Sequence, residues 1–209
     1  LVGSEMCIRD REEIAGQFPA AKVERLDFDT ARTRTAYERI ISDFEKGKTQ
    51  ILIGTQMLSK GLDFGNVSVV GILSADSLMN FPDFRAHERA YQLMVQVSGR
   101  AGRRDKRGTV ILQTTQPEHP LIRMVQHFAY KEMVSLQLSE RSMFRYPPYY
   151  RLIVLILRSR NEEALQEMSA LYAEKLRARL GERVLGPVTP PITRVQTLHI
   201  KKIVLKIEI

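Results

Sequence analysis

The residues best suited to chemistry are two arginines, Arg100 and Arg103, in the stretch Gln-Val-Ser-Gly-Arg-Ala-Gly-Arg over residues 96–103. Each arginine directly follows a glycine, so the backbone can bend and bring two guanidinium groups close together. Guanidinium groups are always charged and present a planar fork of donors, which suits phosphate oxygens. The stretch therefore predicts a phosphate-binding loop at the end of a helix. The alternative is a solvated turn in which these arginines, and the basic residues after them, are surface charge.

A second candidate segment runs from Ile51 to Phe64 and reads Ile-Leu-Ile-Gly-Thr-Gln-Met-Leu-Ser-Lys-Gly-Leu-Asp-Phe. Its apolar start predicts a short buried strand, and open α/β sheets bind ligands where their parallel strands end. At that end Thr55 offers a hydroxyl to a phosphate. Asp63 is placed to accept hydrogen bonds from a sugar hydroxyl or an arginine. An ordinary strand followed by two turns would give the same pattern.

The elements that must position these two segments alternate between strands and helices. Apolar runs predict strands at 23–27, 51–54, 67–73 and 108–114. Helical spacing predicts helices at 36–44, 83–97 and 119–138, the first with Thr30 as its N-cap and Gly47 at its end. Alternation of this kind predicts right-handed crossovers and a parallel sheet, that is, an α/β fold.

The chain changes character at Tyr146-Pro147-Pro148, which cannot continue a helix. A strand at 151–157, a helix at 162–180 and a final strand near the end predict a small α+β domain, with breaks at Gly186-Pro187 and Pro190-Pro191. The apolar face expected for this helix comprises Leu165, Met168, Leu171, Tyr172, Leu176 and Leu180. Residues 1–130 carry 18 basic and 16 acidic residues, whereas residues 131–209 carry 14 and 8. The positive charge is thus concentrated in the second domain, and it favours an acidic partner such as nucleic acid.

In this order, and about 40 residues apart, the two segments resemble motifs V and VI of superfamily 2 helicases. Two features narrow the resemblance to the primosomal protein N′ family of bacterial replication-restart helicases. One is Lys60 before Gly61, and the other is the run Asp83-Phe84-Arg85 followed by Glu88, Arg89 and Gln92. The similarity extends from about Arg11 to the end of the chain. It implies a second RecA-like helicase lobe with a parallel sheet over residues 11–140 and a small α+β C-terminal domain, truncated at its end, over 141–209.

The resemblance also assigns roles to residues. It implies that Arg100 and Arg103 reach the γ-phosphate of ATP, with Arg103 favoured as the arginine finger, and that Gln96 helps to position water or phosphate. Nucleotide binding is expected at Gly61, Asp63, Gly99, Arg100 and Arg103. DNA binding is expected at Thr55, Gln56, Lys60 and Tyr149. Tyr149 belongs to a mixture of tyrosines and arginines around the Pro-Pro turn, which suits stacking on unpaired bases or, alternatively, a packed interdomain hinge.

The resemblance further implies an ATP-dependent 3′→5′ DNA helicase that restarts stalled forks and initiates primosome assembly. Its ATP and Mg²⁺ would be held mainly by a first lobe outside this sequence, where the family's zinc module also lies. The chain alone is therefore expected to be inactive. Expected partners are stalled forks, single-stranded DNA, single-strand-binding protein and other primosome proteins, on the bacterial nucleoid in the cytoplasm. The alternatives are another superfamily 2 translocase, or a non-catalytic nucleic-acid-binding scaffold with a degenerate RecA-like lobe.

Other patterns point away from further chemistry. Gly47-Lys48-Thr49 has the letters of a phosphate-loop end, but Ser42 stands where the loop needs its first glycine, so a helix C-cap is predicted. The four histidines lack metal-ligand spacing, and a single cysteine, Cys7, excludes an internal disulfide. Residues 1–10 lack a clear period and follow no initiator Met; we expect them to be disordered or foreign to the native chain. No apolar run is long enough to predict a membrane span.

Overall fold

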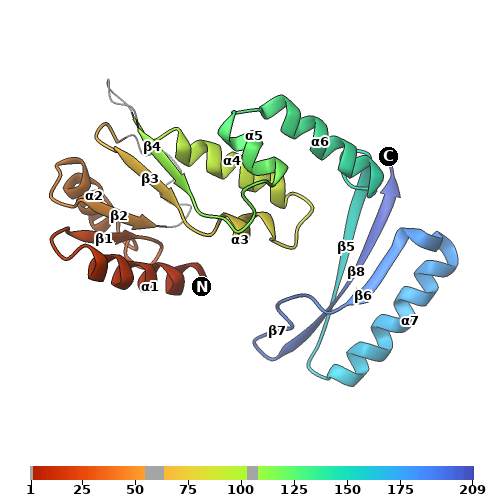
Figure 1. Cartoon of the computed structure of the whole chain (residues 1–209). Coiled ribbons are helices and arrows are strands. Elements are labelled where there is room, and N and C mark those ends of the chain that lie inside the picture. Colours follow the sequence, from red (N-terminus) through yellow and green to blue (C-terminus); the bar gives the residue numbers. More distant parts are fainter. Residues whose placement is uncertain (1, 55–63, 103–107) are drawn as a thin grey trace. The chain divides into compact units, whose positions relative to one another are not determined.

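A computed structural model describes residues 2–54, 64–102 and 108–209 of the chain (Figure 1). Contacts divide it into two compact units, residues 1–133 and 134–209. The expected segments Thr55–Asp63 and Arg103 lie outside the described residues. In the described part, no helix is both long and apolar enough to cross a bilayer. The predicted domain bounds, 1–10, 11–140 and 141–209, stay predictions.

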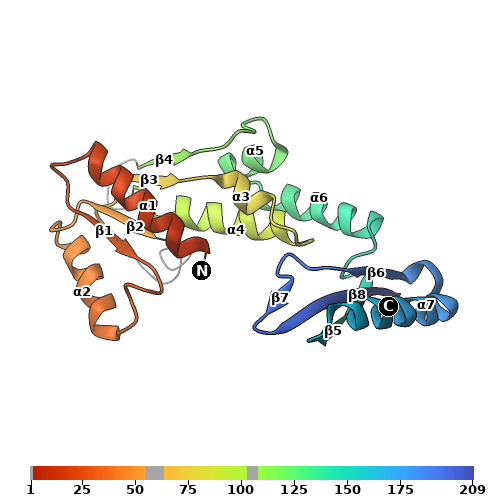
Figure 2. The same cartoon turned by 90° about the horizontal axis from the view of Figure 1, so that it is seen from below.

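The first unit starts with a helix and a pair of parallel strands. Helix α1 (Val2–Gln17) is followed by β1 (Val23–Leu26), α2 (Arg34–Glu45) and β2 (Ile51–Gly54), with Leu26 opposite Gly54 in the register. Alternation along the strands sends Val23 and Ile53 toward Ile14 of α1, whereas Leu26 packs with Ile40 of α2. The pair is thus covered by a helix on each face, as buried parallel strands require (Figures 1 and 2).

A second parallel pair follows in the same unit. It consists of β3 (Val69–Ile72) and β4 (Thr109–Leu112), connected through α3 (Ala75–Met79) and α4 (Ala86–Ser98). Ala86, Ala90, Tyr91 and Met94 form the buried face of α4, and burial raises the pKa of the Tyr91 hydroxyl. The parallel strands expected from the sequence are confirmed, and in the described residues they form two pairs.

Two helix predictions for residues 30–143 are wrong in detail. Thr30 is not the N-cap of α2: the cap is Thr33, whose hydroxyl accepts a hydrogen bond from the Ala36 N–H at 3.2 Å. The helix expected at 119–138 is two helices, α5 (Pro120–Gln126) and α6 (Tyr130–Met143). Between them Phe128 has a left-handed φ of 51°, without the glycine or proline that would have marked the break.

Residues 2–10, expected to be irregular, form the first half of α1. The helix has no bearing on whether these residues belong to the native chain, so that expectation stays a prediction. By contrast, the predicted end of α2 is confirmed. The helix stops at Glu45, and the N–H of Gly47 donates to the Phe44 carbonyl at 3.0 Å.

The second unit is an antiparallel sheet with one long helix against it. Strand β5 (Tyr150–Ser159) pairs with β8 (Leu198–Glu208), which also pairs with β6 (Val184–Val188) and the short β7 (Arg194–Val195). Helix α7 (Glu162–Leu180) lies along one face, and a single 3-10 turn (Gly181–Arg183) leads from it into β6 (Figures 1 and 2). The predicted α+β architecture is confirmed, but Gly186-Pro187 does not break the chain: it forms an irregularity within β6.

The core of this unit forms where α7 meets the sheet. Ala173 of α7 packs with Val184, Ile203 and Leu205, and Ile203 is fully buried. The expected apolar face of α7 is correct at Leu165, Leu176 and Leu180 but wrong at Met168, Leu171 and Tyr172, which are exposed. Small side chains, Ser169 and Ala173, take the central positions because the helix approaches the sheet closely there.

We predict that Ile203→Ala destabilises the chain by about 2–5 kcal/mol, because it removes buried methyl groups and leaves a cavity between β8 and α7. The matched control is Leu171→Ala on α7. Its side chain is 43% exposed, and we expect its loss to cost less than about 1 kcal/mol. Urea unfolding of both variants measures the difference. Equal losses of stability would contradict this assignment of the core.

Candidate nucleotide and DNA site

The described residues that border the two candidate segments lie at the β1–β2 pair and at the core between this pair and α2. Gly54, the last described residue before the first segment continues, lies opposite Leu26 in the parallel register. Phe64, where the description resumes, packs against Leu26 and stacks edge-on against Phe44 with ring centroids 4.8 Å apart. Gly54 is therefore at the carboxyl edge of the β1–β2 pair, where α/β sheets bind ligands, and the chain returns at Phe64 to the core between this pair and α2.

The start of the arginine-rich loop is attached through Val67 to the core that contains Phe64. Val67 packs against the core cluster of Leu26 and Phe64, and its carbonyl accepts a hydrogen bond from the Gly102 N–H at 3.1 Å. Helix α4 ends at Ser98 with Gly99 as its C-cap, and Arg100 N–H donates to the Val97 carbonyl at 3.0 Å. The start of the loop is thus fixed by backbone hydrogen bonds and lies against the same core as Phe64.

Glycine is required at two positions in this loop. Gly102 has a φ of 76°, in the left-handed region that other residues avoid. A Cβ on Gly108, just before β4, would lie 2.2 Å from the Gly102 nitrogen and 2.4 Å from the Ala101 carbonyl carbon. The start and end of the loop therefore touch, and a side chain at Gly108 would force them apart. Gly102, which precedes Arg103 in the sequence pattern, lies at this close approach.

The expected site residues fall into two groups. Of the described ones, Gln96 and Gly99 are exposed at the end of α4, while Arg100 is half-buried beside them. Tyr149 is 44% exposed in the second unit. The others, Thr55, Gln56, Lys60, Gly61, Asp63 and Arg103, lie outside the described residues. Their roles remain predictions, and so do those of the four described residues.

The residues before α4 are organised by ion pairs. Asp83 accepts a hydrogen bond from the Arg85 N–H at 2.8 Å, and its second oxygen lies 3.0 Å from Arg89. Arg85 pairs with Glu88 at 3.0 Å, and this contact raises the pKa of the arginine. The run from Asp83 to Arg89, which narrowed the family resemblance in the sequence, therefore stabilises the start of α4. Arg100 follows the other end of this helix.

A buried carboxylate that the sequence pattern did not single out lies at the carboxyl end of β1. Asp27 follows β1 directly and is 1% exposed. Its Oδ1 accepts hydrogen bonds from the Asp29 N–H at 3.1 Å, the Thr30 N–H at 2.9 Å and the Thr30 hydroxyl at 3.1 Å. Its Oδ2 lies 2.8 Å from Arg25 Nε. The pattern Asp-x-Asp-Thr after a strand is the signal that was available, because Asp side chains commonly cap the turn that follows them.

One further carboxylate and two histidines near the strand ends have structural partners. Asp76 of α3 accepts hydrogen bonds from the Thr114 hydroxyl at 2.6 Å and the Thr115 N–H at 2.8 Å, and these bonds lower the pKa of Asp76. His119 Nδ1 caps α5 by accepting from the Leu121 N–H, and its ring lies 5.4 Å from that of His87. No group of three possible metal-ligating side chains occurs among the described residues.

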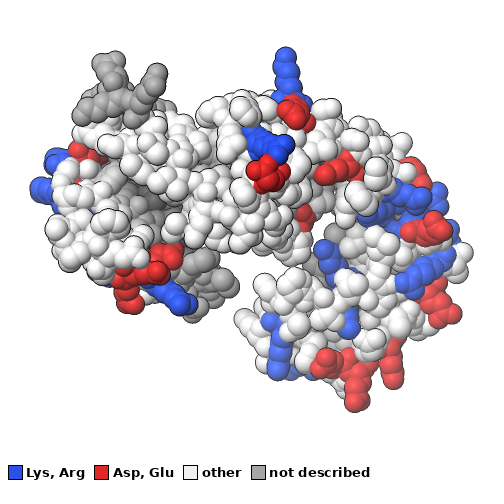
Figure 3. Space-filling view, viewed as in Figure 1, with Lys and Arg blue, Asp and Glu red and all other residues white. Residues whose placement is uncertain are grey.

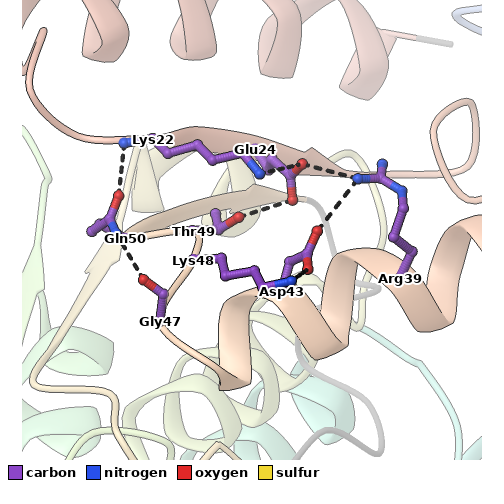
Figure 4. Close-up of polar contacts among 8 residues, drawn as sticks. All are labelled: Lys22, Glu24, Arg39, Asp43, Gly47, Lys48, Thr49 and Gln50. Atoms are coloured by element: carbon purple, nitrogen blue, oxygen red, sulfur yellow. Dashed lines mark hydrogen bonds and ion pairs between the residues drawn. The ribbon is translucent and has the colours of Figure 1, made fainter.

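The Gly47-Lys48-Thr49 sequence lies at the opposite, amino-terminal end of the β1–β2 pair (Figure 4). Thr49 is 1% exposed, and its hydroxyl donates to Glu24 Oε2 at 3.0 Å. Lys48 lies 3.5 Å from Asp43, which also receives the Lys48 and Thr49 N–H groups on its backbone carbonyl. The side chains of Lys48 and Thr49 are thus engaged at the junction of α2 with the strands, and the prediction of a helix C-cap in place of a phosphate loop is confirmed.

In the second unit, the aromatic residues around Pro147-Pro148 have different environments. Lys206 Nζ lies 3.7 Å above the Tyr146 ring and donates to the Phe144 carbonyl at 2.6 Å. Burial, and then the nearby Arg145, lower the pKa of Lys206. Tyr146 therefore packs against β8, as the hinge alternative expects, whereas Tyr149 keeps an exposed ring.

Comparison with protein-family models defines the class first. Residues 6–105 match the helicase conserved C-terminal domain, and residues 142–208 match the primosomal protein N C-terminal domain. Together with the parallel strands of the first unit and the antiparallel sheet of the second, these matches confirm the expected fold class, a RecA-like helicase lobe followed by a small α+β domain.

The chain belongs to the primosomal protein N′ (PriA) family. It is 42% identical over 204 residues to replication restart protein PriA of Bacillus subtilis, covering 95% of this chain and 25% of that protein. The PriA protein of Synechocystis is 40% identical over 187 residues, covering 88% of this chain and 22% of that protein. The chain thus spans about a quarter of the length of these relatives.

Among solved structures, the C-terminal domain of the DEAD-box protein Dbp5 aligns with 18% identity and a TM-score of 0.44. The alignment covers 63% of this chain and 77% of that one. Similarity at this level is too weak for a residue-by-residue comparison.

We predict that Asp27→Asn destabilises the chain by about 1–3 kcal/mol, because the amide leaves Arg25 without its buried carboxylate partner. Asp29→Asn is the matched control. The Asp29 side chain is 39% exposed and pairs with the exposed Arg32, so its loss should cost less than about 1 kcal/mol. Chemical unfolding at neutral pH measures both effects. Similar values for the two variants would show that the Asp27 pair contributes no more than a surface pair.

Proposed function

We propose that this chain is the arginine-finger lobe and C-terminal domain of an ATP-dependent DNA helicase that restarts stalled replication forks. The observation that carries the proposal is the joining of the described ends of both motifs at one core, Leu26, Phe64 and Val67, in a chain of the PriA family. A phosphate site needs several groups in a fixed position, and this core holds the segments that would supply them.

Arg103 is the arginine finger in this proposal, with Arg100 beside it on the same loop. Their guanidinium groups neutralise the negative charge that develops when the terminal phosphate of ATP is transferred to water, an effect of about 10³–10⁵ in rate. Gln96, exposed one turn before Gly99, orients water or phosphate. Gly99, Gly61 and Asp63 complete the nucleotide side, and the backbone bends required at Gly102 and Gly108 allow the loop to approach the phosphates.

The remaining nucleotide-binding groups belong to a first lobe. The 209 residues contain neither the G-x-x-x-x-G-K-[ST] sequence of a phosphate loop nor an Asp-Glu pair for Mg²⁺. ATP and Mg²⁺ are therefore bound mainly by the longer protein, as is the zinc of the family. The chain supplies no complete catalytic site and should not turn over ATP alone.

The DNA side is formed by Thr55, Gln56 and Lys60 in the first unit and by Tyr149 in the second. Movement along DNA is 3′→5′ in this proposal, on stalled forks or single strands, with single-strand-binding protein and other primosome proteins as partners in the bacterial cytoplasm at the nucleoid. The exposure of Tyr149 beside Arg145 and Arg151 supports a contact with unpaired DNA, because an aromatic face stacks on any base.

We expect Arg103→Ala in the full-length protein to lower DNA-stimulated ATP turnover by about 10³-fold or more, with little change in ATP affinity. Arg104→Ala, which alters the adjacent basic residue outside the motif, is the control and should keep most of the activity. A steady-state phosphate-release assay, with nucleotide affinity measured separately, makes the comparison.

The isolated 209-residue chain should release no phosphate in the same assay. If the isolated chain hydrolyses ATP and Arg103→Ala abolishes that hydrolysis, the phosphate loop and Mg²⁺ ligands do not have to come from a first lobe, and this part of the proposal is wrong. Full-length turnover that Arg103→Ala leaves unchanged would contradict the arginine-finger role, whereas a full-length protein with no DNA-stimulated turnover would favour the scaffold alternative.

Tyr149→Ala should weaken binding of the chain to single-stranded DNA by roughly 5- to 150-fold while leaving its melting temperature nearly unchanged. Tyr172→Ala is the matched control, since Tyr172 is 51% exposed on α7. Fluorescence anisotropy with a labelled oligonucleotide at several salt concentrations measures the effect. A loss of affinity equal to that of the control, or a large fall in melting temperature, would assign Tyr149 to packing.

A further inference from the structure

The sheet of the second unit has two faces, and only one is covered by α7. Ile203 and Leu205 of β8, together with Leu155 and Leu157 of β5, point toward α7. Because side chains alternate along a strand, the residues between them point to the opposite face. We call this opposite face of β5, β8 and β6 the open face.

The open face carries aliphatic side chains across all three strands. Val204 at its centre is flanked in the register by Val154 of β5 and Leu185 of β6. One step along, Lys202 lies between Ile156 and Val188. The exposed fractions are 43% for Val154, 53% for Ile156, 44% for Leu185 and 49% for Val188. Aliphatic residues adjoining one another on three strands form a continuous apolar surface, which marks a binding site more often than scattered residues do.

The charges around this surface are of one sign. Register places Lys202 within it and Arg158 opposite Ile200 toward one end. Lys206, opposite Leu152 toward the other end, is engaged by the Tyr146 ring and the Phe144 carbonyl. The acidic residue of these strands on this face, Glu208, is neutralised by Arg183, whose Nε lies 2.7 Å from it. The neighbourhood of the aliphatic residues therefore favours a partner that is apolar in its middle and acidic at its sides.

The chemistry of the surface distinguishes a peptide from nucleic acid. Sheets that bind single strands do so by stacking bases on aromatic side chains. Across β5, β6 and β8 the aromatic residue on this face is Tyr150, half-buried at the start of β5. Val, Ile and Leu have no π-face for a base, but they pack well against an apolar stripe on a helix.

We propose that the open face is a docking surface for an amphipathic α-helix of a partner protein, with acidic residues on both sides of its apolar stripe. The stripe packs on Val154, Ile156 and Val204, and the flanking carboxylates pair with Lys202 and Arg158. This interaction is separate from the phosphate chemistry of the first unit, and it does not require ATP or the other lobe.

The probe is a fluorescein-labelled helical peptide of about 18 residues with leucines at i, i+3, i+4 and i+7 spacing and glutamates beside them. The matched probe has lysines in place of the glutamates. Anisotropy titrations with the 209-residue chain should give at least about tenfold tighter binding of the acidic peptide, and this preference should shrink as salt is added.

Two variants test the surface. The double variant V154T/I156T replaces methyl groups by hydroxyls while keeping residues that favour strands, and Lys202→Glu reverses the central charge. Each should weaken binding of the acidic peptide by at least about tenfold. Met168→Gln on α7 is the control: it alters an exposed apolar side chain beyond the open face and should leave the affinity within about twofold. Circular dichroism melting establishes that each variant folds, and Lys202→Glu provides the test if the double variant does not.

Several results would overturn the proposal. One is equal binding of the acidic and basic peptides, or no binding of either. Another is unchanged affinity in both Lys202→Glu and V154T/I156T. A third is displacement of the acidic peptide by a single-stranded oligonucleotide, together with loss of oligonucleotide binding in V154T/I156T. That result would make the open face a nucleic-acid surface. Dimerisation in solution that depends on Ile156 would assign it to a second copy of the chain.

Discussion

Packing of Phe64 and Val67 in the core cluster that contains Leu26 and Ile40 is the constraint on which the candidate site depends. Leu26 is the last residue of β1 and is fully buried. Phe64 ends one motif and contacts Leu26, and Val67 receives the Gly102 N–H from the other. Described residues that border two segments about 40 residues apart are therefore joined through this core cluster and one backbone hydrogen bond.

The two ends of the β1–β2 pair have different chemistry for a physical reason. At the amino-terminal end, Glu24, Asp43 and Thr49 use their polar groups on one another and on neighbouring lysines and arginines (Figure 4). Groups engaged in this way stabilise the attachment of α2 and have little left for a ligand. At the carboxyl end, the Asp27 carboxylate is buried and shapes the turn that follows β1.

Much of the fold could be predicted from the sequence because the signals were local. Helix α7 has the predicted bounds, 162–180, since Asn161 caps it and Gly181 follows it. Strands β1 to β4 lie within a few residues of their predicted positions, because continuous apolar runs identify buried parallel strands. In the candidate site, the glycines around Arg100 were correctly associated with a bend at the end of a helix, which the φ of Gly102 confirms.

The failures share a cause, which is that tertiary contacts chose among local options of similar energy. Thr30 and Thr33 are both acceptable N-caps, but Asp27 engages Thr30 and leaves Thr33 for the helix. Phe128 takes a left-handed φ between α5 and α6 although nothing in its residue type requires it. Helix α7 has large apolar residues on two sides, and the close approach of β8 selects the side with Ser169 and Ala173. Asp27 was missed because its role depends on Arg25, on a strand whose orientation the sequence does not reveal.

Net charge is a poor guide to which surface meets which partner in this chain. The second domain carries most of the net positive charge, but its visible face mixes acidic and basic side chains rather than presenting one basic area (Figure 3). Several of its basic residues are neutralised or enclosed: Arg183 pairs with Glu208, and Lys206 lies over Tyr146 with a lowered pKa. What distinguishes its surfaces is the side chain beside each charge. An exposed tyrosine near arginines suits unpaired bases, whereas lysine among valine, isoleucine and leucine suits an apolar helix with acidic flanks. Under these two proposals, one domain of modest net charge serves two partners, because the uncharged residues decide which of them each cation meets.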